Sequence, residues 1–339
     1  MKLNHTRQSP FLLSEMPLSQ SSPTVKKVLA VVYSQTGQLL SIADSILQPL
    51  RDDHSIRVHV ETLRPRQPYP FPWPFFRFLD TFPESIHLLP DELEPLTVAD
   101  DEEFDLVIIF YQVWFLAPSR PVVAFLHHPR AQDLLEGKPV VTVVACRNMW
   151  MNAHRRMTEL LQKRGAHLTD NVVLTDKAPT LVTLLTTPLW LLTGRKRPIH
   201  GLPPAGVPTP EIARSVRFGR ALRDALKSDL ELHRTPMLLG LKAVEAQPEL
   251  LVSERAGARS FCLWGKLLRM AGPPGAWQRL PLLGLYLLFL IVIIITVVPV
   301  SLAVQALLRP SLKPRLGAIK QAFEQPSGSG DERMTRYDF

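Results

Sequence analysis

The feature that most constrains the fold of this chain is a set of five short apolar runs, rich in β-branched residues. Each run has the length and composition of a buried strand. The predicted strands cover residues 28–33, 56–62, 105–111, 138–146 and 171–176. Helical spacing of apolar residues appears between several of them, at residues 38–50, 120–135 and 152–164. Because alternating strands and helices form βαβ units, the sequence predicts an α/β fold with a doubly wound, five-stranded parallel sheet.

The candidate ligand site follows from this topology. In a doubly wound sheet, ligands bind beyond the carboxyl ends of the strands, where the strand order reverses. The loops to consider are therefore those after the first, third and fourth predicted strands, at residues 34–38, 112–119 and 147–151.

The first of these loops joins a predicted strand to a predicted helix and holds Ser34, Gln35, Thr36, Gly37 and Gln38. Backbone N–H groups at a helix N-terminus favour an anion, and the hydroxyl and amide side chains add neutral donors. Gly37 permits close backbone approach. Because the loop holds no Lys or Arg, the pattern predicts a terminal phosphate bound by neutral donors. The alternative is a polar turn in which Ser34 or Thr36 only caps the helix.

The second loop, "YQVWFLAPSRP", carries large flat side chains. Trp114 and Phe115 are suited to stacking on the ring system of a ligand. Gln112, the backbone and the neighbouring Leu116 are predicted to contact the same ring. The alternative is that Trp114 and Phe115 belong to the core.

The third loop begins with Cys146, Arg147 and Asn148, which we predict to contact the ligand. Arg147 would stabilise negative charge on it, and its alternative role is a surface ion pair. Cys146 fits a small packing residue better than a nucleophile. No metal site is expected, because the adjacent His127 and His128 point to different faces. No catalytic proton-transfer residue is identified.

These motifs resemble those of known flavoproteins. "YSQTGQL" resembles the phosphate loop of flavodoxins, and it departs from that pattern at Leu39, where flavodoxins often carry another hydroxyl. Five stretches resemble the bacterial dialkylresorcinol condensing enzyme family of dialkylresorcinol biosynthesis. They are "KVLAVVYSQTGQL", "YPFPWP", "YQVWFLAPS", "GKPVVTVVACRNMW" and "LTDKA". This resemblance covers about residues 25–219.

The resemblance implies a flavodoxin-like fold, FMN as cofactor, and oxidation of a cyclohexanedione to the aromatic resorcinol. It also implies a lipid-like substrate, with a ketosynthase and an acyl carrier protein as expected partners. The name "condensing enzyme" fits the sequence poorly, because no Cys/His arrangement of a ketosynthase is visible. The remaining interpretations are an NAD(P)H:quinone-type reductase, a flavodoxin-type electron carrier, and a flavin-free membrane scaffold.

One segment predicts membrane insertion. Residues 281–308 hold no charged side chain, and a span needs about 20 apolar residues. Pro299 would kink this segment or mark a re-entrant turn. Basic residues flank both ends, so charge does not set the orientation. We expect a protein anchored in the bacterial inner membrane, with its sheet domain in the cytoplasm.

Composition bounds the other partners and the domain plan. The net charge is +8, but no basic stripe interleaves with aromatics, so nucleic acid is not an expected partner. Two cysteines favour a reducing compartment.

The expected domains follow in order along the chain. They are a disordered N-terminus (1–24), a flavodoxin-like domain (25–200), a helical linker with helices at 209–227 and 248–270 (201–280), a transmembrane segment (281–308) and a basic, disordered tail (309–339).

Overall fold

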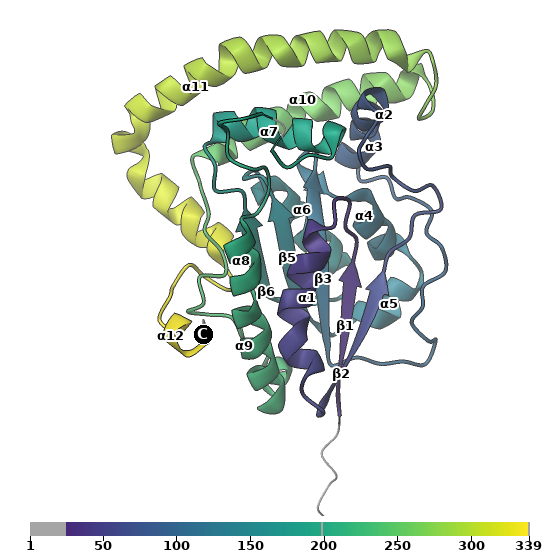
Figure 1. The fold of residues 1–339 in the computed structure, drawn as a ribbon, viewed down its shortest axis with the longest axis vertical. Coiled ribbons are helices and arrows are strands. Elements are labelled where there is room, and N and C mark those ends of the chain that lie inside the picture. Colours follow the sequence, from purple (N-terminus) through teal and green to yellow (C-terminus); the bar gives the residue numbers. More distant parts are fainter. Residues whose placement is uncertain (1–24, 198, 338–339) are drawn as a thin grey trace, which may run out of the picture.

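The computed structural model describes residues 25–197 and 199–337, so the expected disorder of residues 1–24 lies outside it. Five strands form a parallel sheet in the order β2-β1-β3-β5-β6 (Figure 1). They are β1 (Lys26–Val32), β2 (Ile56–Thr62), β3 (Leu106–Trp114), β5 (Pro139–Cys146) and β6 (His167–Thr175). The two-residue β4 (Ala117–Pro118) pairs antiparallel with the end of β3. This order is that of flavodoxin-like doubly wound sheets, which confirms the predicted fold class.

Helices cover both faces of the sheet. Figure 1 shows α1 (Gln38–Arg51), α8 (Thr209–Arg214) and α9 (Val216–Lys227) on the front face. On the other face lie α4 (Arg120–His127), α5 (Arg130–Leu135) and α6 (Met151–Lys163). The central strands are apolar and fully buried because both of their faces are covered.

Two predicted helices are each divided in the structure. The helix expected at residues 120–135 breaks at His128, whose ψ of 141° is extended. The following Pro129 disfavours a helical conformation in the residue before it. The helix expected at residues 209–227 is divided at Ser215, and its first part begins at Thr209 with Pro208 as its N-cap.

The segment expected as a helical linker contributes to the sheet domain. A Cβ atom on Gly219 of α9 would lie 1.9 Å from the carbonyl oxygen of Ile46 in α1. The two helix backbones therefore touch, which only glycine permits. A boundary at residue 200 would separate these packed partners. A one-turn 3₁₀ helix, η1 (Leu230–His233), follows α9.

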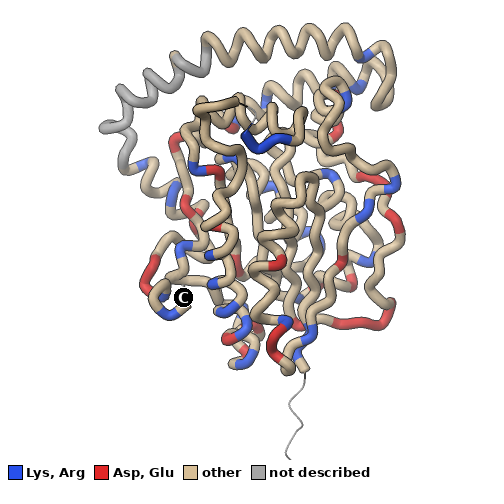
Figure 2. The backbone as a smooth tube through the Cα atoms, in the orientation of Figure 1, with Lys and Arg blue, Asp and Glu red and all other residues tan. Residues whose placement is uncertain are grey.

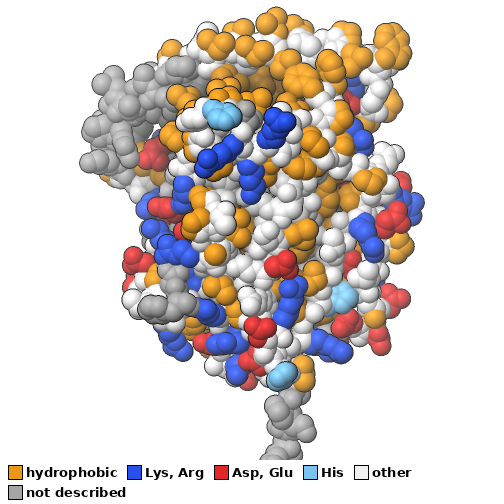
Figure 3. Space-filling model, viewed as in Figure 1, with side chains coloured by type: hydrophobic (Ala, Val, Ile, Leu, Met, Phe, Trp, Pro, Cys, Tyr) orange, Lys and Arg blue, Asp and Glu red, His pale blue; other side chains and the backbone are white. Residues whose placement is uncertain are grey.

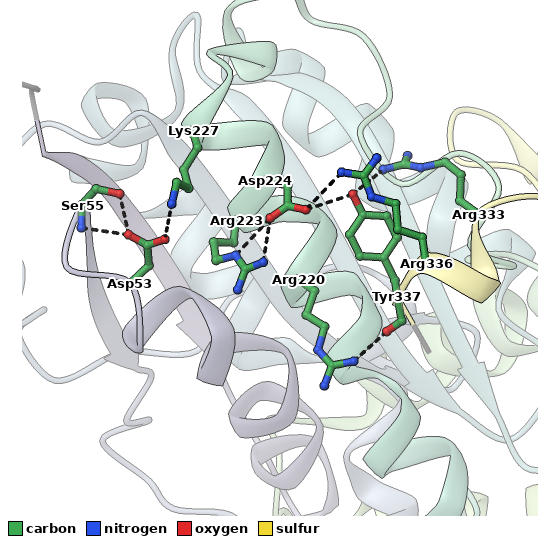
Figure 4. Close-up of polar contacts among 9 residues, drawn as sticks. All are labelled: Asp53, Ser55, Arg220, Arg223, Asp224, Lys227, Arg333, Arg336 and Tyr337. Atoms are coloured by element: carbon green, nitrogen blue, oxygen red, sulfur yellow. Dashed lines mark hydrogen bonds and ion pairs between the residues drawn. The ribbon is translucent and has the colours of Figure 1, made fainter. Parts of the chain in front are cut away.

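The tail expected to be disordered is instead folded against the sheet domain, so this prediction is wrong for the described residues up to 337. The Oγ atom of Ser327 donates to the buried carboxylate of Asp170 in β6 at 2.7 Å. Figure 4 shows Tyr337 of the short helix α12 (Met334–Tyr337) against α9, where its hydroxyl donates to Asp224 at 3.1 Å. This polar segment is ordered because its side chains bind buried partners that are far away in the sequence.

A second layer covers the carboxyl edge of the sheet. We call it the cap. It consists of α2 (Phe75–Asp80), α3 (Phe82–Ile86), α7 (Thr180–Thr193), α10 (Leu250–Ala271) and residues 279–296 of α11 (Arg279–Glu324). Figure 1 shows these helices above the strand tips. The cap has its own apolar cluster, in which the rings of Phe82 and Tyr286 lie 4.4 Å apart. The window Arg279–Thr296 of α11 is long and apolar enough to cross a membrane, with a mean hydropathy of 2.4.

Candidate functional site

The structure brings the three predicted loops to one edge. Strand β3 lies between β1 and β5, and all three strands run parallel, so the loops that follow them are neighbours. The cap covers this edge, and residues 34–38, 112–119 and 147–151 lie beneath it (Figure 1). The ligand roles assigned to them remain predictions.

The first loop has the features of an anion site. Its residues 34–37 lie at the N-terminus of α1, and no backbone amide among them donates a hydrogen bond to another described residue. Gly37 adopts a left-handed φ of 80°, is exposed, and would leave any added Cβ without a neighbour within 4 Å. The Oγ atom of Ser34 is buried and has no partner among the described residues. Open amides at a helix N-terminus favour a phosphate.

The two glutamines of this loop are already engaged. Gln38 accepts from the amide of Val207 at 3.0 Å and donates to its carbonyl at 3.1 Å. Gln35 accepts from the Tyr33 hydroxyl at 2.6 Å and donates to the carbonyl of Pro70 at 2.7 Å. These side chains therefore tie the loop to the segments above it. The donor role expected for Gln38 would require this contact to break.

The second loop separates its two aromatic residues. Trp114 lies in an aromatic cluster with Tyr33, Tyr69 and Trp73, at centroid distances of 4.8–5.9 Å. Phe115 points instead into the apolar cluster of the cap. Phe115 and Leu116 both have positive φ, at 47° and 63°. This strained turn sends the two rings in different directions, so they do not form one stacking surface.

Three of the buried polar atoms that lack a partner in the described chain lie at the ends of the three central strands. They are Ser34 Oγ after β1, Gln112 Oε1 near the end of β3, and Asn148 Oδ1 after β5. All three are buried and accept or donate no hydrogen bond among the described residues. A buried polar atom without a partner costs about 1–3 kcal/mol. Such a group in a native site indicates a ligand or an ordered water.

Arg147 adds a positive charge at the same edge. Its Nη1 atom lies 3.4 Å from the Thr180 carbonyl oxygen and 3.4 Å from the Thr183 hydroxyl oxygen in α7. No carboxylate in the described part of the chain forms an ion pair with it. Burial lowers the pKa of Arg147. Burial also raises the pKa of the neighbouring Cys146 thiol, which keeps that thiol protonated and argues against a nucleophile.

Sequence reasoning missed the carboxylate of Glu254 in α10. It is fully buried and accepts from the amides of Met151 and Asn152, at 3.3 and 2.7 Å, so it caps α6 directly after the third loop. Burial raises the pKa of Glu254 to about 7. The two segments are about a hundred residues apart, and no local pattern joins them. In the sequence, Glu254 stands next to Arg255, and nothing in this stretch marks it as a buried residue.

Two surface clefts of the described chain lie elsewhere. One is lined by Asp91, His127 and His128, among others, and the second by His154, Arg155 and Phe323. Within residues 25–197 and 199–337, no group of His, Cys, Asp and Glu has the arrangement of a metal site. The partnerless atoms under the cap therefore remain the candidate site.

Comparison with known proteins gives structural likeness only. No protein-family model matches the chain, and no curated protein matches it. A flavoprotein in complex with FMN from Lactobacillus acidophilus is 17% identical over 44% of this chain and 93% of its own, with a TM-score of 0.36. A flavodoxin from the domain Archaea is 11% identical, covers 59% of this chain and 99% of its own, and has a TM-score of 0.33. An oxidised flavodoxin from Bacillus cereus is 17% identical over 45% of this chain and 87% of its own, with a TM-score of 0.28.

Proposed function

We propose that the chain binds FMN at the carboxyl edge of its sheet and acts as a flavin-dependent oxidoreductase. The partnerless buried atoms Ser34 Oγ, Gln112 Oε1 and Asn148 Oδ1 carry this proposal. They follow three neighbouring strands of a flavodoxin-like sheet, which is where such sheets bind FMN. The amides of residues 34–37 would hold the phosphate. Gln112 and Asn148 would meet polar atoms of the ring.

The residues present fit FMN in charge as well as in position. Neutral donors at a helix N-terminus suit the terminal phosphate of FMN. Arg147, which has no carboxylate partner in the described chain, would lie near the ring and stabilise negative charge on its reduced form. When bound, FMN supplies a two-electron acceptor. The role of this chain is to orient it and to exclude water under the cap.

The finer proposal concerns the substrate. We propose a membrane-anchored enzyme that aromatises a lipid-like cyclohexanedione in dialkylresorcinol biosynthesis. The five sequence stretches that resemble the dialkylresorcinol condensing enzyme family support it, as does an apolar cap over the site. Aromatisation removes two electrons and two protons from the dione. A bound FMN would supply the acceptor for the electron pair, and a further acceptor, such as a quinone, would be needed for turnover.

Flavin binding is tested first. The protein is purified in mild detergent and titrated with FMN and with riboflavin, which lacks the phosphate, while flavin fluorescence is followed. We expect FMN to bind at least about 100-fold more tightly, because several hydrogen bonds to a charged group are lost with the phosphate. Equal affinities would contradict the phosphate site, and no binding of either would contradict the function.

A matched pair of glycine variants then tests the loop. Gly37→Asp places a carboxylate beside the proposed phosphate. The control, Gly137→Asp, places a carboxylate at the opposite edge of the sheet, away from the proposed phosphate. Both glycines are exposed, have similar φ values of 80° and 71°, and would leave a Cβ without neighbours within 4 Å. We expect Gly37→Asp to lose FMN binding and Gly137→Asp to retain it. Equal retention of FMN in both variants would refute the assignment of this loop.

Activity separates the enzyme interpretations. Anaerobic mixing of the oxidised protein with an alkyl cyclohexanedione should give one resorcinol per bound flavin and bleach the flavin absorbance. Rapid bleaching by NADPH alone would favour a reductase. Bleaching by neither, in a protein that binds FMN, would favour an electron carrier.

A further inference from the structure

The long helix α11 has its two ends attached to the same folded body. At its start, the guanidinium of Arg279 is 1% exposed and pairs with Glu84 at 2.7 Å and Asp80 at 3.0 Å. Both carboxylates belong to the segment inserted after β2. Breaking a buried pair by removing one partner is strongly destabilising, so this end is firmly held.

The far end of α11 returns to the sheet. Phe323 packs on Trp150, which follows β5, with ring centroids 6.3 Å apart. The carboxylate of Glu324 accepts from the amide of Ala246 at 3.2 Å, and Ser327 then donates to Asp170 in β6. Figure 1 shows α11 passing over the cap and descending beside the sheet. A helix held at both ends by one folded body has both ends on the same side of any membrane.

The outward face of the cap is apolar. Large hydrophobic side chains are exposed on four of its helices and in the turn between α10 and α11. They are Phe75 and Phe76 of α2, Leu181 and Leu185 of α7, Val252, Leu263, Leu267 and Met270 of α10, Trp277, and Leu280, Leu285, Leu288, Ile291, Val292 and Ile295 of α11. Figure 3 shows many hydrophobic side chains over the top of the molecule, where the cap lies. A contiguous exposed patch of this kind marks a protein or membrane interface.

The charges of the cap select a partner. The exposed ionic side chains of α2, of α10 and of residues 194–197, which directly follow α7, are basic. They are Arg77, Arg195, Lys196, Arg197, Arg255, Arg259, Lys266 and Arg269. The acidic residues of these helices are not free: Asp80 pairs with Arg279, and Glu254 binds amides of α6. Figure 2 shows the upper stretch of α11 without charge and basic residues below it. Apolar side chains with a basic fringe match an anionic lipid surface.

We propose that the cap docks on an anionic lipid leaflet and that α11 enters and leaves this leaflet on the same side, without crossing the bilayer. The proposal deepens the membrane association in the proposed function and rests on it. It is independent of flavin. The backbone of α11 is helical over Arg279–Glu324, so its hydrogen bonds remain satisfied in lipid. The C-terminal residues up to 337 then lie on the same side as the sheet.

Vesicle flotation tests the lipid class. The full chain is mixed with vesicles of phosphatidylcholine alone, or with a third of phosphatidylglycerol. We expect binding to the anionic vesicles to be at least about tenfold tighter and to weaken with salt. The double variant Arg259→Glu/Lys266→Glu should lose this preference. Its charge-matched control, Arg57→Glu/Lys163→Glu, changes two exposed basic residues outside the cap and should retain it.

Double labelling tests the topology. Cysteines are introduced at Arg57 and Thr335, both exposed, in a chain whose Cys146 and Cys262 are replaced by Ala. Intact vesicles carrying the protein are treated with a membrane-impermeant maleimide, and the labels per molecule are counted by mass spectrometry. Same-side ends give molecules with two labels or none, whatever their orientation, whereas a spanning helix gives one label each. If the alanine chain misfolds, the natural chain serves after its own labelling is subtracted.

Each outcome has a distinct meaning. One label per molecule in a chain that floats overturns the same-side arrangement and leaves membrane association intact. Equal binding to both lipid compositions overturns the anionic preference. No flotation with either overturns the association itself, and an accompanying soluble dimer would identify a second copy of the chain as the occupant of the cap.

Discussion

The carboxylate of Asp170 provides a quantitative test of the folded C-terminal segment. It is fully buried in β6 and accepts from the amides of Met237 and Leu238, at 2.8 and 3.0 Å, and from Ser327. Burial raises its pKa from 3.8 to about 6, although these hydrogen bonds and the nearby Arg333 lower it. The folded state therefore prefers the protonated acid, and the unfolded chain ionises first as pH rises.

The sign and size of the effect follow from this pKa. Between pH 3.8 and about 6 the folded protein binds more protons at Asp170 than the unfolded chain does, so the free energy of unfolding falls as pH rises. One pKa unit corresponds to about 1.4 kcal/mol. The contribution of the protonated acid is complete only below about pH 3, and about 3 kcal/mol of it is lost by about pH 7.

The Asp170→Asn variant removes this titration. Urea unfolding of the wild type and the variant in the same detergent, followed by tryptophan fluorescence, gives their difference in free energy of unfolding at each pH. We expect the wild type to lose about 2 kcal/mol relative to the variant from pH 4 to pH 7. Asp44→Asn changes an exposed carboxylate and should shift the free energy by less than about 0.5 kcal/mol. A difference between Asp170→Asn and wild type that is flat over this range would refute the reasoning.

Three further substitutions test separate parts of the structure. Gly219→Ala forces α9 away from the Ile46 carbonyl and should lower the free energy of unfolding by about 1–3 kcal/mol in urea; an unchanged value would contradict the close helix contact. Glu84→Gln leaves the buried Arg279 short of charge and should cost about 3–5 kcal/mol and speed proteolysis between the cap and the sheet; unchanged proteolysis would show that the pair does not hold α11. Gln112→Leu removes a partnerless buried carbonyl, so the free energy of unfolding without FMN should stay unchanged or rise by about 1 kcal/mol. The same variant should bind FMN more weakly. Unchanged FMN binding would exclude Gln112 from the site.

The sheet could be predicted from the sequence because its signals are local. The run predicted as a strand at residues 105–111 is apolar enough to identify a strand buried on both faces, and β2 begins and ends at the predicted residues, Ile56 and Thr62. The alternation of strands and helices then predicts parallel strands joined by right-handed crossovers. The break at His128 was also readable in principle, since the proline that follows it disfavours a helix.

The environment of the predicted site could not be read in the same way. The sequence identified Ser34, Gln112 and Asn148, and the structure leaves a buried polar atom of each without a partner. It could not show that Gln38 binds Val207, because that partner is 169 residues away. It also could not show that Trp114 and Phe115 enter different clusters, since this depends on two consecutive positive φ values at residues without a glycine signal.

The position of the cap distinguishes among the functions proposed for this edge. An electron carrier needs an exposed flavin edge, but α7 and α10 lie over the loops at this edge, and Arg147 and Leu116 contact them. A nicotinamide nucleotide is strongly anionic and water-soluble, whereas the outward face of the cap is apolar. If this face docks on lipid, the short route to the site leads from the leaflet. An apolar dione that delivers electrons and a quinone that removes them would both reach the site by that route. Docking of the cap on lipid is therefore consistent with the proposed oxidation of a lipid-like dione.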